Sequence, residues 1–64
     1  MSLYDYEQSK QLRHVPFYSL IMAAMRRADS YNLDRLQAAF PQVWAEMQAR
    51  YNAPGGLLTG ETDD

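Results

Sequence analysis

The chain has 64 residues, a formal charge of −2, no Cys and one His. This length allows one small domain, and the lack of Cys excludes disulfides, Cys-ligated zinc and thiol nucleophiles. Residues 1–56 carry six basic and five acidic side chains, whereas residues 57–64 carry three acidic side chains and no basic one. This distribution argues against nucleic-acid binding through bulk charge.

No apolar run approaches the roughly 18 residues of a membrane span. The acidic, polar N-terminus is unlike a secretory signal. We therefore expect a soluble cytoplasmic protein with no membrane association. A core of this size contributes roughly 3–5 kcal/mol net, so self-association or a partner is expected to add to it.

The first helix is predicted over residues 3–13. Ser2 is its expected N-cap, and Asp5 completes a capping box because it stands three residues later. The apolar stripe of this segment is incomplete. We expect this helix to lie across the core rather than within it.

Pro16 disfavours helical geometry at Val15 and suits the first turn of a new helix. The second helix is therefore predicted over residues 16–29, with Phe17, Leu20 and Met25 on its apolar face.

Two shorter helices are predicted next, over residues 33–39 and 41–51. Asn32 is the expected N-cap of the first, and Pro41 opens the second as an N1 proline. Asn52 is expected to take a left-handed cap position, and Leu57 and Leu58 to fold back onto the core.

The sequence thus predicts an all-α fold, a compact array of three or four short helices. The domain is expected to occupy residues 1–58, followed by a disordered acidic tail at 59–64. Trp44 is placed at the centre of the core. The other predicted core residues are Phe17, Leu20, Ile21, Leu36, Phe40 and Met47.

Arg and Tyr residues form the candidate binding group, because guanidinium forks grip carboxylates and phosphates and Tyr rings stack on planar groups. They could hold an anionic, nucleotide-like ligand or form hot spots on a protein interface. They could equally be solvated arginines and rim tyrosines. The candidate binding residues are Arg26, Arg27, Tyr31, Arg35, Arg50 and Tyr51.

The sequence gives little support for catalysis, for a metal site or for a phosphate-binding loop. His14 lacks a nucleophile or metal-ligand partner at helical spacing, and Asp29 with Asp34 lacks the closing Glu of a calcium loop. Gly55-Gly56 lacks the Lys and Ser or Thr of a phosphate-binding loop. No catalytic residue, metal site or cofactor is expected.

The run PFYSLIMAAMRRAD, followed by AFPQVW and RYNAPGG, resembles short uncharacterised open reading frames of bacteriophage and prophage genomes. The resemblance covers about residues 6–56. No activity is attached to that group, so no site residue is carried over. The resemblance implies a small phage protein acting inside a bacterial cell, and such proteins often bind a host protein or sequester a signalling molecule.

We therefore expect a non-enzymatic helical binding protein whose partner is a host or phage protein, or a second copy of the chain. The alternative is a protein that binds or sequesters a small anionic, nucleotide-like ligand. A helix-turn-helix across residues 33–51 is a weaker possibility, because the second helix offers mainly Gln42, Gln48 and Arg50 as readers of DNA.

Overall fold

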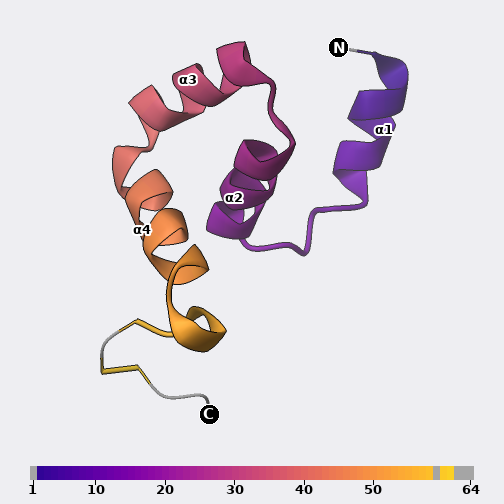
Figure 1. Ribbon diagram of the computed structural model, residues 1–64. Helices are drawn as coiled ribbons and strands as arrows, with labels where there is room; N and C mark the ends of the chain where they lie inside the picture. Colours follow the sequence, from indigo (N-terminus) through magenta and orange to yellow (C-terminus); the bar gives the residue numbers. More distant parts are fainter. Residues whose placement is uncertain (1, 59, 62–64) are drawn as a thin grey trace.

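A computed structural model describes residues 2–58 and 60–61. It contains four α-helices and one short 3-10 helix, and the described residues include no strand (Figure 1). The all-α prediction is confirmed. The helices are α1 (Leu3–Lys10), α2 (Phe17–Arg27), α3 (Ser30–Ala39) and α4 (Pro41–Tyr51), followed by η1 (Pro54–Gly56).

Helix α4 organises the packing, because it contacts α2, α3 and η1. Helices α2 and α3 also contact each other, so α2, α3 and α4 form one three-helix unit (Figure 1). The α3–α4 connection is a single residue, Phe40, whose φ of −133° and ψ of 61° end one helix and begin the next. Pro41 follows at N1, as predicted.

Helix α1 stands apart from this unit (Figure 1). Its capping box forms as predicted: the Ser2 hydroxyl accepts from the Asp5 amide, and the Ser2 amide donates to the Asp5 carboxylate, both at 3.2 Å. Within the described residues, α1 contacts no other helix and none of its side chains is buried. The prediction that this helix lies across the core was therefore wrong.

The predicted end of the first helix, at residue 13, was also wrong. Helix α1 ends at Lys10, and residues 11–15 form tight turns in which Leu12 donates to the Ser9 carbonyl and Val15 to the Leu12 carbonyl. The Arg13 guanidinium donates to the Lys10 carbonyl at 3.1 Å. This bond satisfies a backbone acceptor that the next helical turn would otherwise have used.

The boundary between the second and third helices differs from the prediction as well. Asp29 is the N-cap of α3, and its carboxylate accepts from the Asn32 amide at 2.9 Å. Helix α3 therefore begins at Ser30, and Asn32 lies inside it instead of capping it. Helix α2 ends at Arg27 because Ala28 is extended, with ψ of 143°, so that Asp29 can reach its capping position.

The C-terminal end of α4 stops at Tyr51, as predicted, but through a different cap. Asn52 has φ of −90° and not a left-handed conformation, and its side-chain amide donates to the Gln48 carbonyl. The left-handed positions fall at Gly55 and Gly56, with φ of 64° and 73°, because glycine adopts positive φ without steric cost. Leu57 and Leu58 are half-buried, in agreement with the expected fold-back.

The core is very small. Met25 and Met47, on the facing helices α2 and α4, are the two buried apolar residues of the described chain, at 3% and 8% exposure. Phe17 is 58% exposed, so its assignment to the core was wrong. Trp44 is half-buried, because the two methionines fill the centre that we expected it to occupy. The remaining predicted core residues, Leu20, Ile21, Leu36 and Phe40, are also half-buried.

The molecule is more open than the compact array that the sequence predicted. Its radius of gyration is 13.9 Å, whereas about 11 Å is typical of a compact chain of this length. Its extents are 43 × 27 × 16 Å. None of the helices in the described part of the chain has the length and apolar character needed to cross a lipid bilayer.

Candidate functional site

The six predicted binding residues do not form one cluster. Arg27 and Arg35 line a groove between α2 and α3, whereas Arg26 and Tyr51 line a groove between α2 and α4. Arg50 lies in neither groove and is held by carboxylates. Tyr31 is 68% exposed and lies beside Arg35.

The α2–α3 groove is the larger, with a volume of about 610 Å³. Arg27 comes from the last turn of α2 and Arg35 from the middle of α3. Apart from Asn32, the other residues that line the groove are small or apolar. The lining residues are Ala24, Arg27, Ala28, Asn32, Arg35 and Leu36.

Tyr31 positions Arg35 at this groove. The Arg35 guanidinium carbon lies 5.3 Å from the centre of the Tyr31 ring, within the range of a cation–π contact. The two residues are one helical turn apart on α3, which begins early enough to include both because Asp29 is its N-cap. This contact limits the rotamers that Arg35 samples.

The second groove has a volume of about 230 Å³ and leads to the core. It is lined by Met25, Arg26, Trp44, Met47, Gln48 and Tyr51. Arg26 and Arg27 are consecutive in α2 but face different grooves, because adjacent residues of a helix do not share a face. The predicted grouping of Arg26 with Arg27 therefore does not describe one site.

Arg50 closes the C-terminal segment onto α4. Its guanidinium donates to both Glu61 carboxylate oxygens and to the Gly56 carbonyl at 2.8 Å, and to Glu46 at 3.1 Å. The Arg50 hydrogen bonds, with a further bond from the Leu58 amide, lower the pKa of Glu61 to about 2. The same carboxylates, Glu61 first, raise the pKa of Arg50 above its ordinary value. Arg50 is thus committed to a structural contact.

The contact between Arg50 and Glu61 concerns two of the predictions, the disordered tail and the helix-turn-helix. Of the tail predicted at 59–64, Gly60 and Glu61 are described, while Thr59 and residues 62–64 lie outside the described residues. A DNA-reading role for the second helix of a helix-turn-helix relied on Arg50. Because its donors are already satisfied by carboxylates and a carbonyl, no observation favours that role.

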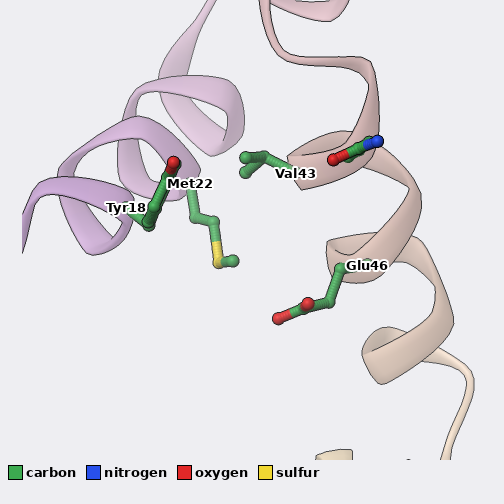
Figure 2. A pocket seen from close by; sticks show the side chains of 5 residues that line it. Tyr18, Met22, Val43 and Glu46 are labelled. Carbon is green, nitrogen blue, oxygen red and sulfur yellow. The ribbon is translucent and has the colours of Figure 1, made fainter.

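A third hollow opens on α2 and α4 toward the N-terminal end of α2. Figure 2 shows Met22 projecting from α2, and Val43 and Glu46 from α4, toward the same gap, with Tyr18 beside Met22 on α2. Gln42 completes its lining. Tyr18, Gln42 and Val43 also line an adjoining hollow with Phe40, so the two hollows lie side by side.

An aromatic patch, formed by Phe17, Tyr18 and Phe40, borders this groove. The Phe17 ring is edge-on to Tyr18 at 5.1 Å and to Phe40 at 6.1 Å between centroids. Phe17 and Tyr18 are each 58% exposed. Placing Phe17 in the core by helical spacing missed this surface, because α1, the helix that precedes Phe17, contacts no other helix of the described chain and does not cover it.

Asn32 is the other residue that the sequence argument missed. Interpreting Asn32 as a cap removed it from the list of possible ligand-binding side chains, although it shares a face of α3 with Arg35 and Leu36. The available signal for the true start of α3 was Asp29, because Asp is itself a strong N-cap residue and Asn32 follows it by three residues.

The remaining candidates show no arrangement typical of catalysis. His14 is exposed in the turn after α1. Asp29 is occupied in capping α3. The described residues include no group of three His, Cys, Asp or Glu side chains placed to hold a metal ion. Gly55 and Gly56 form η1 and the turn that follows α4.

Comparison with known proteins found no match: no family model, curated protein or solved structure is detectably similar to this chain.

Proposed function

We propose that this chain is a non-enzymatic protein-binding module, and that a second copy of the chain covers its exposed aromatic patch. In the setting that the sequence resemblance implies, it acts as a small phage protein in the bacterial cytoplasm. The observation that carries the proposal is the mismatch between a two-methionine core and a large exposed apolar surface. Nine large hydrophobic side chains of the described chain are exposed: Leu3, Tyr4, Tyr6, Leu12, Val15, Phe17, Tyr18, Tyr31 and Tyr51.

The exposed area supports a partner of substantial size. The chain exposes 5576 Å², whereas a folded monomer of this mass typically exposes about 4,200 Å². The difference exceeds the roughly 800 Å² that each partner contributes to a standard interface. A symmetric dimer with one standard-sized interface per chain would therefore cover about 800 Å² of this excess on each copy.

The aromatic patch is the best-defined part of that surface. Aromatic side chains are enriched at interface hot spots, because they bury a large area at low conformational-entropy cost. The Phe17 ring lies edge to face with both Tyr18 and Phe40, and the adjoining groove between α2 and α4 gives a partner side chain a hollow to enter. In a two-fold arrangement, each copy would present both the aromatic patch and the groove.

Sedimentation velocity across a wide concentration range tests the proposal. We expect the wild-type mass to rise with concentration, and Phe17→Glu to remain monomeric. Because Phe17 is exposed, that substitution should preserve the helical circular-dichroism spectrum. The matched control is Tyr51→Glu, since Tyr51 is 78% exposed but lies outside the aromatic patch. This control should still associate.

A wild-type chain that stays monomeric at all concentrations would refute self-association. Equal loss of association in Phe17→Glu and Tyr51→Glu would refute the role of the aromatic patch. A monomer that instead binds a defined phage or host protein, with the complex lost in Phe17→Glu alone, would replace the second copy with that protein.

A further inference from the structure

We propose that the α2–α3 groove binds a small phosphorylated organic molecule, with Arg27 and Arg35 holding the phosphate. This site is separate from the aromatic patch and does not depend on self-association. Three observations carry the proposal: the unbalanced positive charge of the groove, the placement of its polar groups, and its size.

The groove concentrates positive charge on a chain whose formal charge is −2. Two arginines line it and no acidic residue does. The ion pairs of the described chain are Lys10–Glu7, Arg50–Glu46 and Arg50–Glu61, so neither Arg27 nor Arg35 takes part in one. Two guanidinium groups balance a phosphate dianion, and each can donate two parallel hydrogen bonds to its oxygens.

The polar groups that line the groove come from two helices. Arg27 approaches from α2, while Arg35 and Asn32 approach from α3, where they are three residues apart and share a face. The Tyr31 ring restrains Arg35, which reduces the side-chain entropy lost on binding. The Asn32 side-chain amide supplies both a donor and an acceptor, suited to a polar group next to the phosphate.

The size of the groove indicates a ligand larger than phosphate itself. Its volume of about 610 Å³ lies in the middle of the roughly 300–1,000 Å³ range of small-molecule sites. Ala24, Ala28 and Leu36 provide the apolar part of its lining. The organic portion of the ligand would rest on these side chains, with the phosphate directed to the arginines. A mononucleotide has the required combination of charge and size.

The test uses AMP, adenosine and inorganic phosphate as probes, titrated into isotopically labelled full-length protein and followed by NMR. We expect AMP to shift the Asn32 side-chain amide and the α2–α3 backbone signals. Adenosine lacks the charge and should not bind. Inorganic phosphate lacks the apolar contact and should bind more weakly than AMP.

Substitutions then test the two arginines. Arg27→Ala and Arg35→Ala should each weaken AMP binding by about tenfold or more, since each removes charge-assisted hydrogen bonds. Both side chains are exposed, so the fold should persist. The matched control is Arg26→Ala, which removes the same charge from the adjacent residue but lines the other groove. It should leave the affinity nearly unchanged.

No binding of AMP at millimolar concentration would overturn the proposal. An equal effect of Arg26→Ala and Arg27→Ala would also overturn it, because attraction by overall charge would then explain the binding. Equal affinity for AMP and inorganic phosphate would refute the organic part of the ligand. Phe17→Glu should bind AMP normally, so failure of self-association and failure of this site can be told apart.

Discussion

Arg50 and Glu61 form a two-pronged ion pair in which both terminal guanidinium nitrogens donate to the two carboxylate oxygens at 2.8 Å. The pair joins α4 to a segment ten residues beyond its end. Glu61 also accepts from the Leu58 amide at 2.9 Å. One carboxylate therefore holds the C-terminal turn closed and aligns it on the last turns of α4.

This pair predicts a pH-dependent release of the C-terminal turn. Because docking lowers the pKa of Glu61 from 4.5 to about 2, the stabilisation is complete above about pH 4.5 and is lost as the pH falls toward 2. NMR titration of the Leu58 amide should show a midpoint well below 4.5. A midpoint at 4.5 would show that the pair does not form, and Glu61→Gln should abolish the transition.

Asp29→Ala should destabilise the three-helix unit by about 1 kcal/mol, because it removes the N-cap of α3. The measurement is urea unfolding followed by circular dichroism. Asn32→Ala is the matched control, because the Asn32 backbone amide donates the capping hydrogen bond to Asp29 and its side chain takes no part in that bond. That variant should be neutral or slightly stabilised. The reverse order of the two effects would restore Asn32 as the cap.

Met25→Ala should cost about 2–4 kcal/mol. A chain of this length has a total stability of only about 3–10 kcal/mol. Met25 is 3% exposed, the lowest value among the described apolar residues. Thermal unfolding should show a large fall in midpoint, while Met25→Leu, which conserves volume, should cost less than about 1.5 kcal/mol. A Met25→Ala variant with wild-type stability would place the core elsewhere.

Helix α1 should exchange its amide hydrogens far faster than α4. The Tyr6 amide donates to the Ser2 carbonyl and the Trp44 amide to the Phe40 carbonyl, and both bonds measure 3.1 Å. Helices shorter than about 12 residues are marginal without tertiary packing, and α1 has none within the described chain. Equal protection of the two amides in the monomer would contradict the separate position of α1.

The sequence predicted those features that local chemistry determines. Pro41 set the start of α4, and the spacing of Ser2 and Asp5 set the capping box. The boundary at Asp29 was missed because Asp29 and Asn32 are both good N-cap residues, and the choice between them depends on where Ala28 becomes extended. Helical spacing identified apolar faces but could not show which ones another helix would cover.

Phe17 and Trp44 illustrate that limit. Both occupy core-type positions in their helices, yet Phe17 is exposed because α1 does not cover it. Trp44 is half-buried because Met25 and Met47 fill the contact between α2 and α4. The sequence predicted which residue types form the candidate site but not which of those residues lie together. Arg27 and Arg35 share a groove, Arg26 faces another, and Arg50 is held by Glu61. Tertiary packing alone decides which groove or ion pair each of these four guanidinium groups joins.

The one-residue connection at Phe40 makes this fold intolerant of length changes at that point. Each residue of an α-helix advances by about 100° around the axis. Deleting Phe40, or inserting one residue beside it, would shift the register of α4 by one residue, which corresponds to about that angle around the α4 axis. Met47 would no longer face α2, and the hydrogen-bonded side chain of Arg50 would rotate with the helix. Natural variants should therefore differ here by substitution, with insertions and deletions confined to the turns flanking the three-helix unit.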